Sequence, residues 1–170
     1  MGRTVNLGRG QIVPYPEPSS PEATAVGKAN RRTGTKPEVE LRRALHATGL
    51  RFRKDLLIRA GGTRTRADVV FPKQRLAVFV DGCFWHVCPE HFHMPKTNLG
   101  YWEPKLQANI ERDARVSKGL SADGWQVVRC WEHVGVDDAV RVVAAALVGL
   151  GHVRAGELLA AASPVVAPPP

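Results

Sequence analysis

One short stretch carries most of the information in this chain: Val78-Phe79-Val80-Asp81-Gly82-Cys83-Phe84-Trp85-His86-Val87-Cys88-Pro89-Glu90-His91. It begins as an apolar run that ends in a carboxylate, and it continues into a C-x4-C-x2-H cluster. Carboxylates suit hard cations and thiolates suit soft ones, and the aromatic pair Phe84-Trp85 lies between the two groups. Few structural roles need all three features together. The combination is typical of an enzyme that opens and cuts a polyanion.

The bulk composition is that of one globular domain. The chain has 170 residues, of which 44% are hydrophobic, enough for one well-buried domain but not for two of ordinary size. The first 36 residues contain no apolar run of the length that a secretory signal needs. The most apolar stretch, 140–150, contains Arg141 and is about half as long as a membrane span. We therefore expect a soluble, intracellular protein with no membrane partner.

The positive charge is concentrated in one segment. The net charge is +8, and residues 28–66 hold twelve Lys/Arg against three Asp/Glu, a local balance of 12 − 3 = +9. Such a block indicates binding to a phosphate backbone or another extended polyanion. A solvated basic face without a partner is the alternative.

The pattern along the chain predicts a mixed α/β fold with helices covering a small sheet. Thr35-Lys-Pro-Glu38 has the form of a capping box, and Gly49 suits a left-handed helix stop. Trp125–Trp131 is nearly all apolar, which predicts a central strand. The predicted boundaries are a flexible arm at 1–27, the main folded domain at 28–150 and a Pro-rich tail at 151–170. The predicted elements are a helix from 35 to 49, a strand at 51–58, a turn at 61–63, strands at 67–71 and 76–80 joined as a hairpin, a helix at 104–120, a strand at 125–131 and a helix at 137–150.

Two aspartates are candidates for a catalytic metal site. Asp68 lies among apolar strand residues, where a carboxylate is costly to bury unless it is paired or binds a cation. Asp81 ends the next strand, so a hairpin could bring the two carboxylates together around Mg²⁺. The alternative for Asp68 is an ion pair with a nearby arginine, and for Asp81 a role in the turn at Gly82.

His86 has two possible roles. It could be a zinc ligand, or it could donate a proton and position water near a scissile phosphate. We favour the second role.

Three residues of the loop predict a structural zinc site. Cys83, Cys88 and His91 supply three ligands, and in a chain without an export signal this arrangement favours metal binding over disulfides. Tetrahedral zinc needs a fourth ligand. His133 is the leading candidate, with Cys130 and His93 as alternatives.

Two aromatic pairs lie in polar surroundings. Phe84 and Trp85 fall inside the metal-binding loop, and Tyr101-Trp102 follows a polar stretch. We interpret them as a wedge that enters a base stack. The alternative is that Trp85 or Trp102 packs beneath the loop.

With these residues in view, the chain resembles the very-short-patch (Vsr) mismatch repair endonucleases. The resemblance covers residues 28–135 and rests on five separated blocks in one order. These blocks are Arg66-Ala-Asp68-Val-Val, Gly82-Cys-Phe-Trp-His86, Tyr101-Trp102, Asn109-Ile-Glu-Arg-Asp113, and Gly124-Trp125 through Trp131-Glu132.

The resemblance implies a restriction-endonuclease-like mixed sheet flanked by helices, a structural zinc and Mg²⁺-dependent nicking of DNA. The implied substrate is DNA with a T·G mismatch left by deamination of 5-methylcytosine. By position, it makes Asp68 the metal-binding aspartate, His86 a catalytic histidine and Asp113 the residue that orients it. Glu38 matches an acid linked to the metal site, although the capping box explains it equally well. The implied wedge is Phe84, Trp85 and Trp102, and the implied zinc ligands are Cys83, Cys88, His91 and His133.

The chain also departs from the family pattern. Asp81 stands where the best-known members have a second catalytic histidine, which leaves room for a second metal-binding carboxylate. The ligand loop is one residue shorter, and Cys and His are exchanged at three ligand positions. Both residue types bind zinc well.

Three functions remain open from the sequence. The first is a monomeric mismatch-nicking enzyme in the bacterial cytoplasm, associated with the nucleoid and working with a cytosine methyltransferase system and mismatch-repair proteins. The second is a restriction-type or structure-specific nuclease without mismatch preference. The third is a zinc-stabilised DNA-binding module without catalysis.

Overall fold

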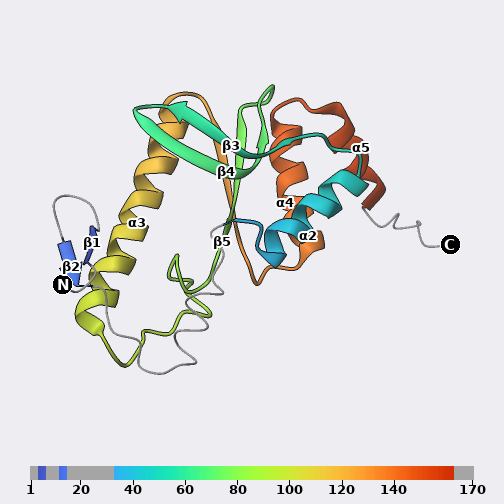
Figure 1. Ribbon diagram of the computed structural model, residues 1–170. Coiled ribbons are helices and arrows are strands. Elements are labelled where there is room, and N and C mark those ends of the chain that lie inside the picture. The colour runs from blue at the N-terminus through green and yellow to red at the C-terminus, as the bar shows by residue number, and fades with distance from the viewer. Residues whose placement is uncertain (1–3, 7–11, 15–32, 163–170) are drawn as a thin grey trace.

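The computed structural model describes the backbone of residues 4–6, 12–14 and 33–162, and the side chains of residues 33–160. Figure 1 shows the arrangement of its elements. The helices are α2 (Lys36–Ala47), α3 (Leu99–Ala122), α4 (Val136–Gly149) and α5 (Val153–Ala162). The strands are β1 (Thr4–Asn6), β2 (Ile12–Pro14), β3 (Arg53–Ala60), β4 (Thr63–Phe71), β5 (Leu76–Asp81) and β6 (Gln126–Trp131).

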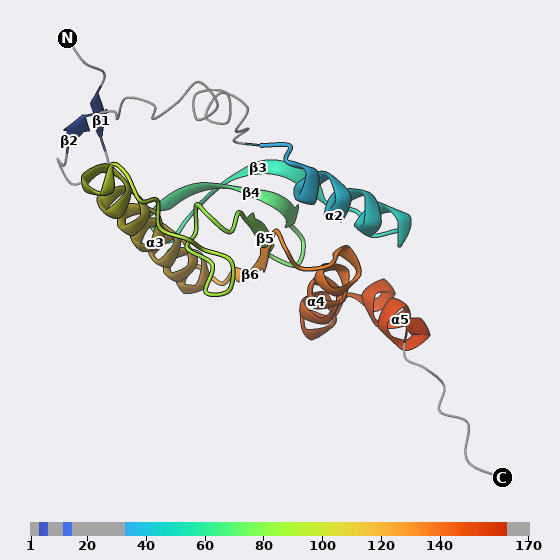
Figure 2. The ribbon, with the colours of Figure 1, turned by 90° about the horizontal axis from the view of Figure 1, so that it is seen from below.

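The predicted mixed sheet flanked by helices is confirmed. Its four strands lie in the order β3-β4-β5-β6, with antiparallel pairs up to β5 and a parallel pair between β5 and β6. Helix α3 lies on one face, while α2 and α4 lie on the other with α5 outside them (Figures 1 and 2). Parallel strands need a crossover connection, and α3 supplies it between β5 and β6.

Two apolar clusters hold these layers together. On one face, α2, α4 and α5 bury Leu45, Val143 and Ala155 against the sheet. On the other, Leu120 of α3 packs with Phe79 and the small side chains of the sheet. The two clusters bury residues on both faces of the sheet, and Asp81 at the carboxyl end of β5 is buried as well.

Local sequence signals explain how several elements begin and end. Pro37 lies in the first turn of α2, and Gly49 takes the predicted left-handed conformation with φ 82° after the helix. Gly61 has φ 52° in the β3–β4 turn, and a Cβ on it would lie 1.8 Å from the carbonyl oxygen of Gly119. Only glycine allows this hairpin to pack directly on α3.

Two predictions about α3 and β6 need correction. Helix α3 begins at Leu99 rather than Pro104, so Trp102 lies in its first turns and Pro104 inside it. Pro104 has no N–H, so the helix lacks the bond that this position would make to the Gly100 carbonyl. Strand β6 is the edge of the described four-stranded sheet and not a central strand. Its apolar residues are buried by helices on its faces rather than by a strand on each side.

Helix α5 was not predicted from the sequence, whose last predicted helix ends at Leu150. Gly151 interrupts the pattern with φ 76°, and the chain then turns back into a new helix. Ala155 is fully buried in the main cluster, and Arg154 donates a hydrogen bond from Nε to the carbonyl of Thr48 at the end of α2, at 3.2 Å. The first half of the predicted tail therefore packs on the domain.

The predicted N-terminal arm lies mostly outside the described residues. Within it, β1 and β2 form a two-stranded antiparallel sheet, which Figures 1 and 2 both place beside α3. No helix among the described residues is long and apolar enough to cross a membrane.

Candidate catalytic and metal sites

Asp68 lies where two strands separate. Strand β4 pairs with β5 only from Val69 to Phe71. Beyond this ladder, the backbone N–H of Val80 donates a hydrogen bond to the Asp68 carboxylate at 2.8 Å. The side chain thus takes the place of a backbone partner and faces the gap between the diverging strands.

The surroundings of Asp68 disfavour its charge. Burial raises the pKa of the carboxyl from 3.8 to about 6, although the hydrogen bond from Val80 opposes the change. The charges of Glu38 and Asp81 raise the pKa further, and Arg42 lowers it. Three acids, Asp68, Glu38 and Asp81, therefore lie within electrostatic reach. A hard divalent cation binds such a group of carboxylates and relieves their repulsion.

Glu38 reaches this place from the first turn of α2. It is buried, and its carboxylate accepts hydrogen bonds from the Gly34 N–H at 2.8 Å and the Thr35 hydroxyl at 2.9 Å. Arg42 donates a third bond at 3.1 Å. The predicted capping box does not form in its reciprocal pattern: the Thr35 side chain makes no bond to the helix N–H groups, and Glu38 accepts from the Gly34 N–H and the Thr35 hydroxyl instead of the Thr35 N–H. Glu38 serves the helix start and lies close to Asp68 at the same time.

Without divalent cations, ionisation of Asp68 should make the protein less stable as pH rises. An acid whose pKa is raised in the folded state stabilises the fold fully below its ordinary pKa of 3.8, and this contribution is lost as pH rises through about 6. The loss is at most about 3 kcal/mol. Denaturant unfolding of the wild type and Asp68→Asn from pH 4 to 7 tests it. The variant should gain stability relative to the wild type over this range, and parallel curves would contradict the shift.

His86 and Asp113 form a close pair between the loop and α3. Their Nδ1 and Oδ2 atoms are 2.5 Å apart, and both side chains are mostly buried. Hydrogen bonding to His86, with the positive charges of Arg129 and Arg112, holds the pKa of Asp113 below its ordinary value despite burial. The pairing that the family resemblance implied is thus present in the structure.

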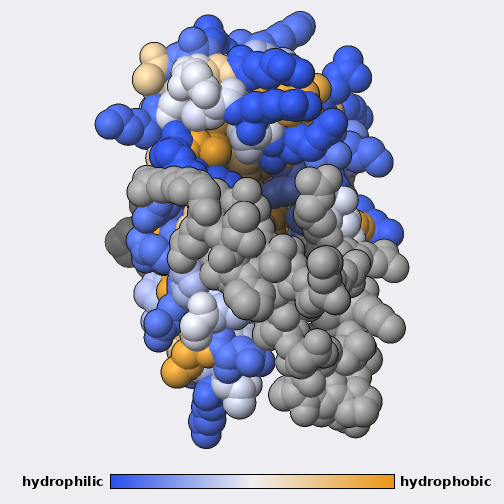
Figure 3. All heavy atoms as spheres, turned by 60° about the vertical axis from the view of Figure 1, so that its left-hand side comes forward, coloured by the Kyte–Doolittle hydropathy of each residue, from blue (hydrophilic) through white to orange (hydrophobic). Residues whose placement is uncertain are grey.

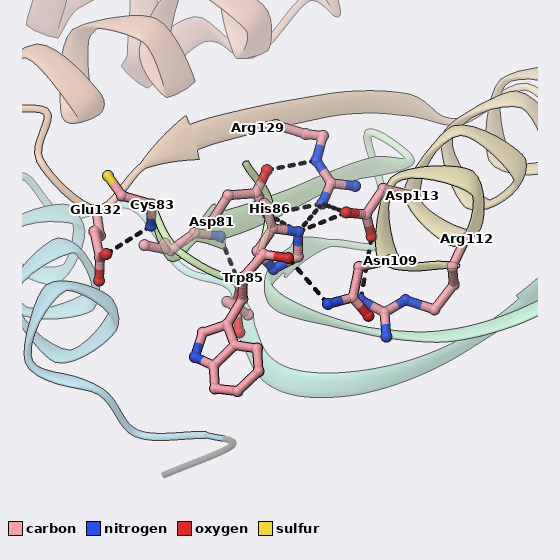
Figure 4. A network of polar contacts seen from close by, with 11 residues as sticks. Asp81, Cys83, Trp85, His86, Asn109, Arg112, Asp113, Arg129 and Glu132 are labelled. Atoms are coloured by element: carbon pink, nitrogen blue, oxygen red, sulfur yellow. Dashed lines mark hydrogen bonds and ion pairs between the residues drawn. The ribbon is translucent and has the colours of Figure 1, made fainter. Parts of the chain in front are cut away.

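Asp81 forms an ion pair with Arg129, so its carboxylate does not serve Asp68 alone. Both of its carboxylate oxygens accept hydrogen bonds from Arg129, at 2.6 Å from Nε and 2.7 Å from Nη2. Figure 4 shows Arg129 between Asp81 and Asp113, with His86 beside them. The sequence reading missed Arg129, although a charged residue in the apolar run of β6 was a signal that could have found it.

Two further anchors fix the loop. The side chain of Asn109 on α3 donates a hydrogen bond to the backbone carbonyl of Trp85 at 3.0 Å. Glu132, just after β6, accepts one from the N–H of Cys83 at 2.6 Å. Asn109 and Asp113 are four residues apart and so lie on one face of α3. This helix face holds the segment Phe84–His86 in place.

The four predicted zinc ligands come together. One ligand atom from each of Cys83, Cys88, His91 and His133 lies within 4.8 Å of the others. The Cys83 sulfur is 3.1 Å from His133 Nδ1, and the Cys88 sulfur is 3.7 Å from the same atom. Ligands of tetrahedral zinc are separated by about 3.3–3.8 Å, given its bond lengths. The cluster is thus compatible with a zinc site, and neither Cys130 nor His93 belongs to it.

The chemistry of these donors also fits a cation. Burial, and then the neighbouring Cys88 thiol, raise the pKa of Cys83 to about 11. The pKa of Cys88 is lowered instead, because hydrogen bonds from Glu90 and His91 outweigh the effect of burial. A positive ion would favour the thiolate form of Cys83 at neutral pH. His133 turns its other nitrogen, Nε2, toward Glu90 at 3.7 Å, as metal-binding imidazoles commonly do toward a carboxylate.

The predicted wedge residues form one aromatic cluster. Phe84 makes edge-on contacts with Trp85 and Trp102, at 5.1 and 5.2 Å between ring centres. Phe92 and Tyr101 extend the cluster. None of these five rings belongs to the two apolar clusters of the core. In Figure 4 the Trp85 ring points away from the charged network.

Several known proteins are similar to this chain. A family model described as DNA mismatch endonuclease Vsr matches residues 20–91. A protein named type II nicking enzyme V.NaeI, from Lentzea aerocolonigenes, is 50% identical over 139 residues, which are 81% of this chain and 84% of that protein. Type II nicking enzyme V.XorIIP of Xanthomonas oryzae is 44% identical over 60% of this chain and 73% of its own. DNA mismatch endonuclease Vsr of Escherichia coli is 34% identical over 56% of this chain and 59% of its own.

Proposed function

We propose that this chain, which belongs to the Vsr family of DNA endonucleases, nicks one strand of DNA at T·G mismatches left by deamination of 5-methylcytosine, with Mg²⁺ as its cofactor. The observation that carries the proposal is the meeting of three parts at the end of β5. A partly buried acid suited to a cation, a histidine held by an aspartate and a cluster of aromatic rings all lie within one loop and its neighbours.

Asp68 would hold the magnesium, with Glu38 contributing from α2. When bound, Mg²⁺ supplies Lewis-acid stabilisation of the phosphate and lowers the pKa of a water molecule. Asp81 lies close enough to raise the pKa of Asp68, so its charge also favours a cation there. The protein itself positions the cation through the hydrogen bond from Val80 to Asp68 and through the bonds that fix Glu38.

His86 would move the proton. The Asp113 carboxylate can only accept a hydrogen bond, so the proton between them is assigned to His86 Nδ1. The Nε2 atom is then the one that can take or give a proton at the scissile phosphate. Asp113 fixes both the tautomer and the ring direction, which is the usual task of the carboxylate in such a pair.

The aromatic cluster would supply the mismatch preference. Inserting Phe84, Trp85 and Trp102 between base pairs costs about a few kcal/mol in unstacking, and a mispaired step costs less than a paired one. The zinc site would hold the loop rigid, so that the rings need not order on binding. Rigid rings discriminate better because little binding energy is used for ordering them.

The basic hairpin of β3 and β4 would hold the DNA backbone. Arg59 and Arg64 are both exposed and lie directly opposite each other in the strand register. Like charges in this position repel, which a phosphate between them would relieve. Arg64, Arg66 and Asp68 alternate along β4 and so share a face that leads toward the candidate metal site. Figure 3 shows hydrophilic side chains gathered on the upper part of the molecule, where Figure 1 places this hairpin.

The proposal also implies partners. A cytosine methyltransferase would create the 5-methylcytosine whose deamination produces the mismatch, and mismatch-repair proteins would act on the nicked product. We propose that the chain acts as a monomer, since all parts of the candidate site come from one copy.

A second candidate function is strand nicking without mismatch preference. Two of the relatives carry the name type II nicking enzyme, which favours this reading. The two functions differ in what the aromatic rings do. Under the first they read the mismatch, and under the second they only support the loop.

Replacing Phe84 and Trp85 together with alanine should separate the two functions. We expect the double variant to lose most of its preference for a T·G duplex over a paired one, since base–aromatic stacking contributes about 1–3 kcal/mol per base, or about 5–150-fold. Single-turnover nicking of both labelled duplexes in Mg²⁺ measures it.

Met94→Ala is the matched control, because Met94 is another exposed apolar residue of the same loop. Equal nicking of both duplexes by the wild type would overturn the mismatch function and leave the second candidate. No nicking of either duplex would overturn both.

A further inference from the structure

We propose that Arg129 is a positioning residue for His86, and that Asp81 acts as the partner of Arg129 rather than as a metal ligand. The inference rests on the proposed role of His86 in nicking. It gives a role to Arg129, to which the family resemblance assigned none, and it gives Asp81 a different task from the one that the sequence suggested.

Arg129 is directed to the site by the sheet. It lies opposite Phe79 in the parallel register of β5 and β6, and its guanidinium sits 5.1 Å from the centre of the Phe79 ring. Side chains alternate along a strand, so Arg129 faces α3 while its neighbours Val128 and Cys130 face the main core. The guanidinium is therefore held between the sheet and α3.

The guanidinium joins two carboxylates from different elements. It donates hydrogen bonds to Asp81 from both Nε and Nη2, and Nη2 also lies 3.3 Å from Asp113 Oδ2 on α3. The planar fork of arginine fits such a two-point contact with a carboxylate, whereas a lysine ammonium cannot make it. Arg129 thus ties the end of β5 to the helix that carries Asp113.

Arg129 acts on the tautomer of His86 through Asp113. The Asp113 carboxylate, 2.5 Å from His86 Nδ1, is the acceptor that holds the proton on that nitrogen. Nη2 of Arg129 is 3.4 Å from the same nitrogen and only donates, so it cannot take this proton. Arg129 therefore positions His86 by holding the acceptor of its Nδ1 proton.

Asp81 completes this arrangement. Its side chain is 7% exposed and accepts both arginine bonds, while Oδ1 is 3.6 Å from His86 Nδ1. A buried guanidinium without a counterion is strongly destabilising, so Asp81 is needed to keep Arg129 in place. With both oxygens engaged by arginine, Asp81 has less capacity left for a metal ion than Asp68, whose protein donor is a single backbone N–H.

Arg129→Lys keeps the charge but loses the fork. We expect the single-turnover nicking rate at saturating enzyme to fall by about 100-fold, the usual cost of a misplaced catalytic group. The Kd for the duplex and the Mg²⁺ concentration at half-maximal rate should stay within about twofold of the wild type, because Arg129 contacts neither ligand in this proposal. Asp81→Asn should lower the nicking rate by a similar factor. The double variant Asp81→Asn with Arg129→Gln should nick little more slowly than either single variant, because the effects of residues that act as a unit are not additive.

Arg75→Lys is the matched control. Arg75 also pairs with an aspartate, Asp123 at 2.9 Å, and lies over a ring, Trp125, but at the opposite end of β5. It should nick at the wild-type rate. The neutral double variant removes both buried charges at once, so it keeps the test open if Arg129→Lys alone fails to fold.

A measurement without DNA separates this inference from the proposed function. The proton on His86 Nδ1, bonded to Asp113, should give a downfield NMR signal in the wild type and in Arg75→Lys, and it should be lost in Arg129→Lys. His86→Gln assigns the signal. A wild type that nicks no duplex but shows this pattern would overturn the function alone.

Three results would overturn the inference itself. An unchanged nicking rate and an unchanged His86 signal in Arg129→Lys would show that the arginine positions nothing. A raised Kd with a smaller salt dependence would make Arg129 a DNA phosphate contact. A raised Mg²⁺ requirement in Asp81→Asn would return Asp81 to the metal site.

Discussion

Asp68→Ala should lower Mg²⁺-dependent nicking of a T·G duplex by about 1,000-fold or more, because Lewis-acid stabilisation amounts to several kcal/mol and each 1.4 kcal/mol is about tenfold in rate. Asp68→Asn should be nearly as inactive. An asparagine oxygen can still accept the hydrogen bond from the Val80 N–H, so this variant removes the charge and keeps the local fold. Strand-specific nicking on a denaturing gel measures both variants.

Binding separates the metal role from a structural one. Both variants should bind the duplex as tightly as the wild type in metal-free buffer, since loss of an acid does not weaken attraction to phosphate. Asp123→Asn is the matched control, because Asp123 is an exposed aspartate paired with Arg75 away from the site. Activity of Asp68→Asn within tenfold of the wild type would remove Asp68 from the metal site.

Cys88→Ser should remove the zinc and lower the melting temperature by about 10 °C or more. A structural zinc contributes on the order of 10 kcal/mol to its binding segment, and in a domain of this size each 1 kcal/mol changes the melting temperature by about 2–4 °C. Cys88 is almost fully buried beside the other ligands, so a serine there cannot replace the thiolate. Metal analysis and thermal unfolding, with and without a chelator, measure the two effects.

The control variants for zinc replace the two residues that the sequence left open as alternative fourth ligands. His93→Ala should keep one zinc per chain, because His93 is exposed and outside the ligand cluster. Cys130→Ala should also keep the zinc, since this thiol is buried in the main core. Loss of zinc from either control, or its retention at full affinity in Cys88→Ser, would show that the ligand set is wrong.

The two sites depend on each other through the loop that they share. The zinc cluster holds Cys83 and Cys88, and the segment between them carries Phe84, Trp85 and His86. We therefore expect zinc loss to reduce nicking by displacing the aromatic cluster and the histidine together. Loss of the Asp68 carboxylate should leave the loop and its aromatic rings in place.

Short-range sequence signals predicted the local structure well. The start of α2 after Thr35, the left-handed Gly49 and the hairpin between β4 and β5 are all set by contacts within a few residues. Three zinc ligands are close in the chain, and the fourth, His133, directly follows a predicted strand. Apart from His133, the atoms that decide the structure are near in sequence in each case, so propensity and spacing were sufficient.

The predictions that failed concern how segments meet in space. The start of α3 at Leu99 depends on packing of its first turns against the aromatic loop rather than on a capping residue, since Asn98 makes no side-chain cap. The edge position of β6 follows from the crossover through α3. Apolar composition reports burial but not whether strands or helices provide it.

Residue types and spacing alone thus determined the mixed α/β class, three of the four candidate zinc ligands and the acidic residues available to a metal. Which acid is free and which is occupied was determined only by the tertiary structure. The parallel pairing of β5 with β6 places Arg129 against Asp81, while the divergence of β4 from β5 leaves Asp68 with a single backbone donor. Arg129 and Asp81 are 48 residues apart, so no local pattern encodes their contact. Charge pairing across that distance depends on chain geometry, and the geometry exists only once the sheet and α3 have packed.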